Sequence, residues 1–192
     1  MTEKDLQVCK SNALVEASYR LSVAEQRIML ACIAQIRRDQ QITDEVLYSV
    51  SATDIAELTG STTNADYSEL KKAALRLKRR EVRIAYEPNG GGKKPEVMVA
   101  SWVQSIVYAE DAGLVRLRFN KDMLPYLCQL TEQFTRYALA DVAKMSSAYA
   151  IRIYEFLIQW RGAGERVIDL DWLREALQLE GRYPAIKDFK KR

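Results

Sequence analysis

Basic side chains are concentrated in the segment SELKKAALRLKRREVRI, residues 68–84, where seven of seventeen residues are lysine or arginine. At about 100° per residue, Leu70, Ala74 and Leu77 fall on one side of a helix and basic residues on the other. Such a face can neutralise DNA phosphates and release their counterions. The alternative is a solvated face beside a core stripe. The nearby segment offers only Glu69 and Glu81 as opposite charges, which favours DNA binding. The candidate contacts are Lys71, Lys72, Arg76, Arg79, Arg80 and Arg83.

The patterns around this segment predict a winged helix-turn-helix. Ser22 and Glu25 form a capping-box pattern at the start of a helix with a wide apolar stripe. A short strand at 45–51 and a short helix from Ser51 to Gly60 come before the basic helix. After it, alternating residues predict a strand near 82–86, a returning strand at 96–109 and a third at 112–120. The loop between the first two carries Lys93 and Lys94, which are further candidates for DNA contact.

A similar order of elements follows about 120 residues later, after a predicted helix near 121–130. A long apolar helix at 146–162 leads to a strand-like run at 166–170, a short helix at 171–181 and a helix beginning at Pro184. We therefore predict an α+β chain with two tandem winged-helix copies, at 1–138 and 139–192. The second copy is expected to be incomplete, because the sequence ends inside its basic helix. Its candidate DNA contacts are Arg182, Lys187, Lys190, Lys191 and Arg192.

The residue types argue against an enzyme. The chain has no histidine, which removes histidine bases and histidine metal ligands. Its three cysteines contain no C-x-x-C pair, and no phosphate-binding glycine loop precedes a helix. We therefore expect no catalytic residues, no metal and no cofactor. The N-terminus has no apolar leader pattern and no run is long enough to span a membrane, so a cytoplasmic protein is expected.

The returning strand is unusually apolar for a small wing. This excess could pack beneath the first long helix, or form a strand edge offered to a second copy. We favour the second interpretation, which gives a dimer interface at Val99, Trp102, Val103 and Ile106.

Three motifs together resemble the theta-type plasmid replication initiators, which bind tandem origin repeats called iterons. The first is SNALVEASYRLSVAEQRIMLACIAQI, in which Asn12, Leu14, Ala17, Tyr19, Leu21, Ser22, Glu25 and Arg27 match the family pattern. The others are YALADVAKMSSAYAIRIYEFLIQW and WLREALQLEGRYPAIKDFKKR. The resemblance spans nearly the whole chain.

This resemblance implies an N-terminal winged-helix domain that mediates dimerisation and adds DNA contacts near residues 76–83. It also implies a second domain that recognises the major groove through the helix beginning at Pro184. The expected function is initiation of plasmid replication at iterons, with repression of the protein's own gene as a dimer. The implied partners are the host initiator protein and the replicative helicase. A winged-helix transcriptional repressor and a protein-interaction domain remain open as alternatives.

Overall fold

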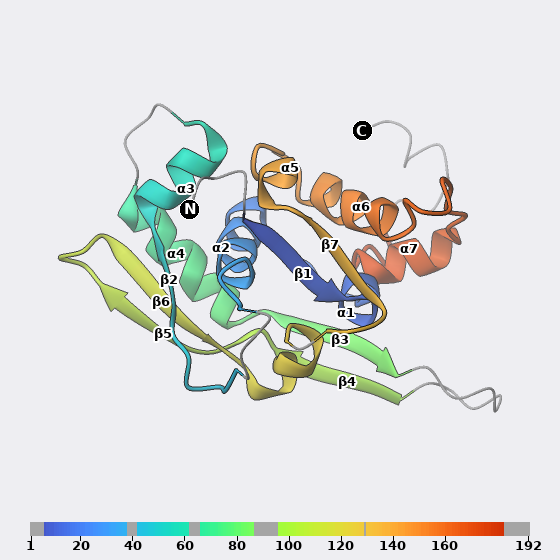
Figure 1. The fold of residues 1–192 in the computed structure, drawn as a ribbon, viewed down its shortest axis with the longest axis horizontal. Coiled ribbons are helices and arrows are strands. Elements are labelled where there is room, and N and C mark those ends of the chain that lie inside the picture. Colours follow the sequence, from blue (N-terminus) through green and yellow to red (C-terminus); the bar gives the residue numbers. More distant parts are fainter. Residues whose placement is uncertain (1–5, 38–41, 62–65, 87–95, 129, 183–192) are drawn as a thin grey trace.

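The computed structural model describes residues 6–37, 42–61, 66–86, 96–128 and 130–182 of the 192-residue chain. Helices and strands are mixed along the chain, which confirms the predicted α+β class (Figure 1). In chain order the elements are β1 (Gln7–Ser11), α1 (Asn12–Glu16), α2 (Val23–Ile33), β2 (Tyr48–Ser51), α3 (Ala52–Thr59), α4 (Tyr67–Lys78), β3 (Glu81–Tyr86), β4 (Glu96–Ser101), β5 (Val103–Ala109), β6 (Leu114–Phe119), the 3-10 helix η2 (Lys121–Tyr126), β7 (Phe134–Ala138), α5 (Leu139–Ala143), α6 (Ala148–Gln159) and α7 (Leu170–Ala176).

The predicted helix starts are confirmed by their caps. The Ser22 hydroxyl accepts from the Glu25 backbone N–H at 3.3 Å, and the Glu25 carboxylate accepts from the Ser22 N–H at 2.9 Å. Ser51 and Asp54 form the same reciprocal pair at the start of α3. That helix ends at Gly60, whose φ of +65° is a left-handed conformation that favours glycine.

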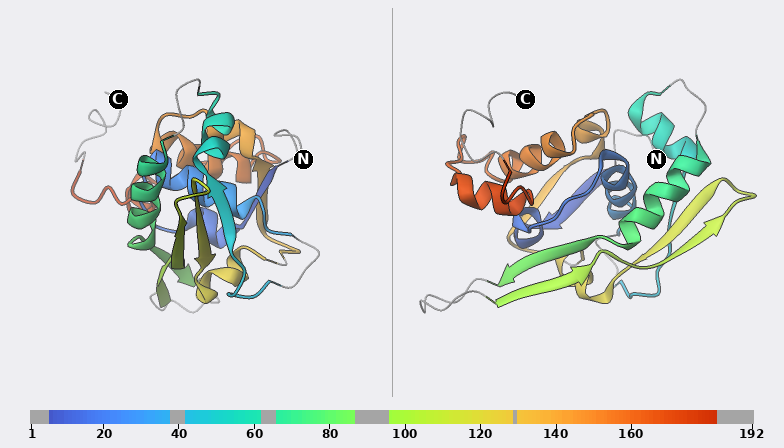
Figure 2. Two further views of the ribbon diagram at one scale, coloured as in Figure 1. Left: turned by 90° about the vertical axis from the view of Figure 1, so that its left-hand side faces the viewer. Right: turned by 180° about the vertical axis from the view of Figure 1, so that it is seen from behind.

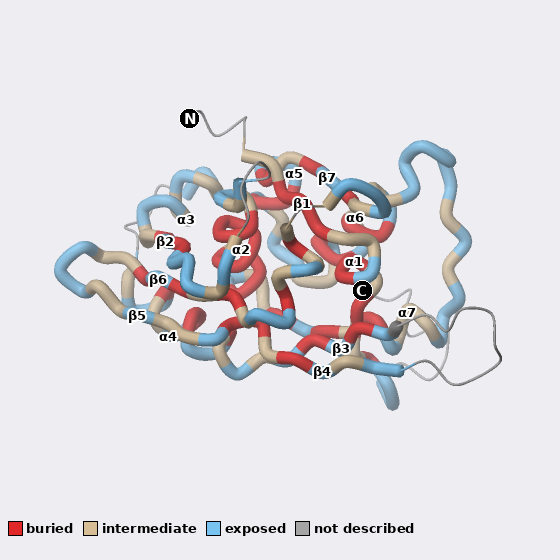
Figure 3. The backbone as a smooth tube through the Cα atoms, turned by 60° about the horizontal axis from the view of Figure 1, so that its bottom comes forward, coloured by how far each residue is buried: buried red, intermediate tan, exposed pale blue. Residues whose placement is uncertain are grey.

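α2 lies in the centre of the molecule and is buried over most of its length (Figure 3). α4 packs against α2 and against one face of the sheet formed by β2, β6 and β5 (Figure 2). Its contact face is the predicted apolar stripe, because Leu70, Ala74 and Leu77 are all buried. The helix-turn-helix of α3 and α4 is thus held by the core, with the basic side of α4 outward.

The predicted single strand at 96–109 is wrong, because the chain changes partner at Trp102. β4 pairs with β3, whereas β5 pairs with β6. Trp102 and Val103 are consecutive and both fully buried, which a regular alternating strand with one exposed face does not allow. The Trp102 ring packs edge-on against Tyr19, with 4.9 Å between ring centroids.

This bend corrects the predicted dimer interface. Trp102 and Val103 have no exposed surface and pack inside their own chain, so neither can form an exposed strand edge. Val99 is 54% exposed, and Ile106 is partly buried against the core. Part of the apolar surface that suggested an interface in residues 96–109 therefore belongs to the core of the same chain.

β1 and β7 form an antiparallel pair that sequence patterns did not predict. Their residues are far apart in the chain, with Cys9 opposite Arg136, so no short-range signal marks the pairing. The predicted helix at 121–130 is instead the short 3-10 helix η2.

The predicted strand at 166–170 is also wrong, because this segment forms no strand and leads directly into α7. Its apolar Val167 is 95% exposed. Asp169 caps α7 by accepting the backbone N–H groups of Asp171 and Trp172. The segment that the alternating pattern predicted to be a strand is therefore a linker that ends in the N-cap of α7.

A second, smaller core lies where α7 meets the rest of the protein. It contains Val15, Phe156, Ala176, Leu177 and Leu179. The predicted boundary between residues 138 and 139 stays a prediction. Side chains from both sides of it nevertheless share the main core, since Val8 and Ile151 belong to one buried cluster.

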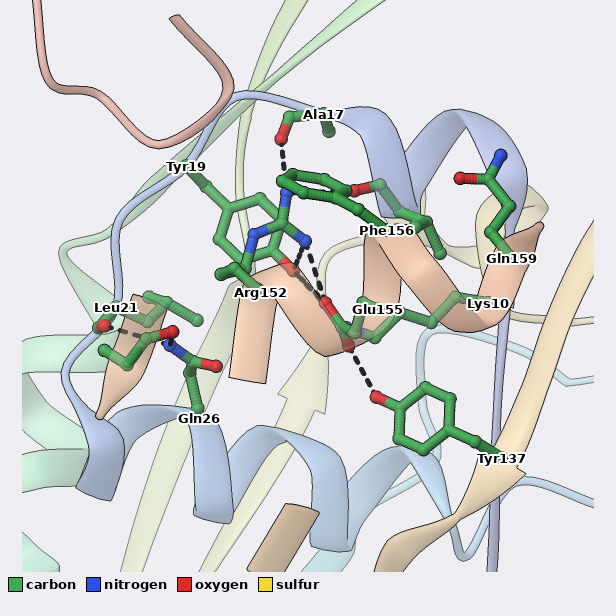
Figure 4. A network of polar contacts seen from close by, with 12 residues as sticks. Lys10, Ala17, Tyr19, Leu21, Gln26, Tyr137, Arg152, Glu155, Phe156 and Gln159 are labelled. Atoms are coloured by element: carbon green, nitrogen blue, oxygen red, sulfur yellow. Dashed lines mark hydrogen bonds and ion pairs between the residues drawn. The ribbon is translucent and has the colours of Figure 1, made fainter. Parts of the chain in front are cut away.

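A fully buried polar network links β1, β7 and α6 (Figure 4). Its centre is the Glu155 carboxylate, which accepts from Lys10 Nζ at 2.5 Å, from Arg152 Nη1 at 2.8 Å and from the Tyr137 hydroxyl. Arg152 also donates through Nη2 to the backbone oxygens of Val15 and Ala17, each at 2.9 Å. A buried charge is tolerated only when it is paired and hydrogen-bonded, so these bonds fix α6 against β1 and α1.

The network sets the protonation of its carboxyl group. Burial by itself raises the pKa of Glu155, but the attraction of Lys10 and Arg152 outweighs it and lowers the pKa from 4.5 to about 2. A carboxyl group whose pKa is lower in the folded state stabilises that state at neutral pH. The contribution is lost as pH falls from about 4.5 through about 2.

We expect Glu155→Gln to destabilise the protein by about 3–5 kcal/mol, because it leaves Lys10 and Arg152 as buried charges without a counterion. Urea denaturation at neutral pH measures this. The matched control is Asp171→Asn, which removes an 87%-exposed carboxylate from its bond to Arg174 and should change stability by less than about 1 kcal/mol. Equal effects of the two substitutions would contradict the importance of the network.

We also expect the Glu155 carboxyl group to titrate near pH 2 in the folded protein, because two cations hold it ionised. The measurement is the carbon-13 shift of its side-chain carboxyl carbon between pH 5 and the acid unfolding transition. A midpoint near the ordinary value of 4.5 would show that the pairing does not stabilise the ionised form.

Candidate nucleic-acid interface

The basic residues of α4 fall into groups with different partners. In its first half, Lys71 Nζ bonds to Glu110 in the turn between β5 and β6. Lys72 Nζ lies 2.9 Å from Glu69 one turn earlier. Both lysines therefore have a carboxylate beside them, and the acidic β5–β6 turn lowers the positive potential at this end of the helix.

Arg76 and Arg80 share one partner, Glu25 on α2. Arg76 Nε lies 3.2 Å and Arg80 Nε 3.1 Å from the carboxylate, whose side chain has no exposed surface. The two arginine side chains remain 47% and 41% exposed. Sequence analysis considered only Glu69 and Glu81 as opposing charges, because Glu25 is brought to α4 by packing between helices.

The end of α4 and the following strand carry three basic residues that form no ion pair among the described residues, although exposed Glu81 lies between them in the sequence. Within the described ranges, no ion pair involves Lys78, Arg79 or Arg83. Arg79 and Arg83 are exposed, and Arg83 lies opposite Val99 on the β3–β4 hairpin. Positive charge without an ion-pair partner is thus concentrated where α4 meets the predicted wing. Lys93 and Lys94 of the wing loop lie outside the described residues.

The end of α7 is hydrogen-bonded to the segment that borders this surface. The Ser18 hydroxyl donates to the Glu175 carbonyl at 2.7 Å, and the Tyr19 N–H donates to the Ala176 carbonyl at 3.4 Å. On its other side, Ser18 exchanges two backbone hydrogen bonds of 2.9 Å with Arg83. Residues 18 and 19 therefore connect α7 to β3.

Part of the predicted second basic group can be located here. Arg182 is exposed beyond α7. The other predicted contacts, Lys187, Lys190, Lys191 and Arg192, lie outside the described residues.

Arg20 is a basic residue near this surface that sequence analysis missed. It is exposed and lines one cleft with Arg80, Tyr149 and Leu177, between the ends of α4 and α7. Arg20 lies in a loop and belongs to no periodic pattern, so the sequence around it gave no sign of a DNA contact.

No cluster of three or more histidine, cysteine, aspartate and glutamate residues in the described ranges could hold a metal ion. Cys32 and Cys128 are free thiols. No helix among the described residues is both long and apolar enough to cross a membrane.

Comparison with known proteins agrees with the arrangement of these elements. A family model described as "Initiator Replication protein, WH1" matches residues 7–158. An Escherichia coli protein named "Uncharacterized 27.6 kDa protein" is 27% identical over 188 residues, covering 93% of this chain and 77% of the relative. A "Replication initiation protein" of Escherichia coli is 28% identical over 191 residues, covering 95% of this chain and 58% of the relative.

One solved structure has the same fold over almost the whole chain. The Pi initiator protein in complex with iteron DNA aligns with a TM-score of 0.76 at 20% identity, covering 98% of this chain and 82% of that one. This likeness confirms the predicted winged-helix fold. Because the family model matches most of the chain, the protein belongs to the initiator replication protein family.

Proposed function

We propose that this protein initiates plasmid replication by binding iteron repeats in double-stranded origin DNA. The observation that carries the proposal is the exposed basic pair of Arg79 and Arg83, which form no ion pair among the described residues, at the junction of α4 and the β3–β4 hairpin on a fold of the initiator family. In a winged helix, the second helix of the helix-turn-helix and the wing both approach the duplex. The relative solved with iteron DNA supports the same class of ligand.

We further propose that the helix predicted from Pro184 supplies the base contacts, while the N-terminal surface contributes phosphate contacts. The hydrogen bonds from Ser18 and Tyr19 to α7 support one continuous surface, because they place Arg83 and Arg182 on segments that are joined. The host initiator protein and the replicative helicase are proposed as partners from family membership, and the cytoplasm as the location.

Selection of bound duplexes from a random DNA pool at near-physiological salt tests the proposal. A recovered motif that occurs as tandem repeats beside a plasmid origin supports it. No retention even at low salt contradicts DNA binding and favours a protein-interaction domain. Loss of an origin plasmid when the protein is removed, with recovery when it is supplied in trans, separates an initiator from a repressor.

The double variant Arg79→Ala/Arg83→Ala should weaken DNA binding and reduce the slope of log affinity against log salt by about two units, one for each lost phosphate contact. The matched control is Lys71→Ala/Lys72→Ala, which also removes two positive charges. Its effect should be smaller, because Glu110 and Glu69 already offset those lysines. Fluorescence anisotropy over a salt series measures both, and equal losses would show that total charge decides affinity.

We propose a homodimer that represses its own gene, with the contact on exposed valines of β4 and β5 in place of Trp102 and Val103. Val97, Val99 and Val107 are 53%, 54% and 43% exposed.

Val99→Glu should shift the protein toward the monomer in sedimentation velocity, because a charge would be buried in the contact. The control Val46→Glu changes a valine that is 39% exposed outside these strands. An unchanged monomer–dimer balance in the Val99 variant would exclude it from the contact.

A further inference from the structure

Glu25 has an unusual position for a carboxylate so close to a DNA-binding surface. It is the third residue of α2, its side chain has no exposed surface, and each of its oxygens accepts two hydrogen bonds. Oε2 accepts from Ser22 N–H and Arg80 Nε, and Oε1 accepts from Arg76 Nε and Arg80 Nη2. A carboxylate has about four such acceptor sites, so its capacity is filled.

The two arginines are bound by one edge only. Arg76 uses Nε alone, which leaves Nη1 and Nη2, and Arg80 uses Nε and Nη2, which leaves Nη1. Among the described residues, no other group is hydrogen-bonded to these amino groups, and the two side chains are roughly half exposed. Two guanidinium groups on one carboxylate also leave one net positive charge.

The fixed orientation has a consequence for anion binding. An arginine that is free in solution loses rotamer freedom when it binds a phosphate, and this loss weakens binding. Arg76 and Arg80 have lost much of that freedom already, because both are hydrogen-bonded to the same Glu25 carboxylate. Guanidinium amino groups in a fixed plane match the geometry of phosphate oxygens.

We propose that Glu25 is a positioning residue for DNA binding, which holds Arg76 and Arg80 so that their remaining amino groups form a ready-made site for one backbone phosphate. This inference rests on the proposed DNA-binding function and adds a role for a residue that does not touch DNA. It predicts an effect opposite in sign to simple electrostatics. Removing a negative charge near DNA should strengthen binding, whereas loss of the positioning group should weaken it.

The test is Glu25→Gln in the full chain, with affinity measured on the duplex recovered by selection or, without a motif, on a mixed-sequence duplex. We expect binding about tenfold weaker, with a salt slope lower by about one unit. Glutamine still supports a capping box, and a thermal melt checks that the variant is folded. The matched control is Glu69→Gln, which makes the same charge change on α4 at a carboxylate that is 63% exposed. It should bind equally well or slightly more tightly.

A double-mutant cycle distinguishes positioning from a general structural effect. In the Arg76→Ala/Arg80→Ala background, Glu25→Gln should cause no further loss, because the groups it positions are absent. The variant Arg76→Lys/Arg80→Lys retains both charges and exposed side chains but loses the planar geometry, and should lose affinity as Glu25→Gln does.

The outcomes separate this inference from the function on which it depends. Wild-type protein that binds no DNA at low salt overturns the proposed function and this inference together. Wild-type binding with a Glu25→Gln variant that is equal or tighter overturns the inference alone. Additive losses in the cycle, or full affinity of the lysine variant, overturn it as well.

Discussion

The fold depends on the burial of one carboxylate, that of Glu155. Inside the protein a charge without a partner would be strongly unfavourable, so the Lys10, Arg152 and Tyr137 side chains must all be in place around it. These groups come from β1, α6 and β7, and Lys10 on β1 lies 145 residues before Glu155, so they cannot all meet until the chain has folded. Arg152 extends the constraint to the end of α1 through the carbonyls of Val15 and Ala17. α6 therefore cannot move away from the first helices without exposing or separating buried charges.

A second buried carboxylate, Glu25, acts nearer the surface in a comparable way. It leaves one net charge and three amino groups of Arg76 and Arg80 that are not bonded to it, while Glu69 and Glu110 offset the lysines at the start of α4. The positive potential of the helix is consequently stronger at its end than at its beginning. Short-range pairing, more than the number of basic residues, determines which part of α4 can attract an anion.

Residues 18 and 19 connect the two ends of the candidate surface. Their backbone pairs with β3 on one side and receives the last turn of α7 on the other, while the Tyr19 ring packs on Trp102 and its hydroxyl joins the Glu155 network. The buried network, the bend in the sheet and the approach of α7 thus meet at one tyrosine. This arrangement gives a physical reason for the Tyr19 position in the family motif, because no smaller side chain could reach both the indole and the carboxylate.

Local patterns were sufficient to predict the capped starts of α2 and α3, the end at Gly60, the apolar stripe of α4, the β3–β4 hairpin and the α+β class. These features depend on residues only a few positions apart, where capping, periodicity and glycine geometry act directly. The β1–β7 pair and the bend at Trp102 could not be predicted in this way, since each is decided by partners far away in the chain. The same holds for the site. The sequence located the basic residues, but only tertiary packing brought Glu25 and Glu110 to them and so decided which charges remain uncompensated, because an ion pair depends on distance in space and not along the chain.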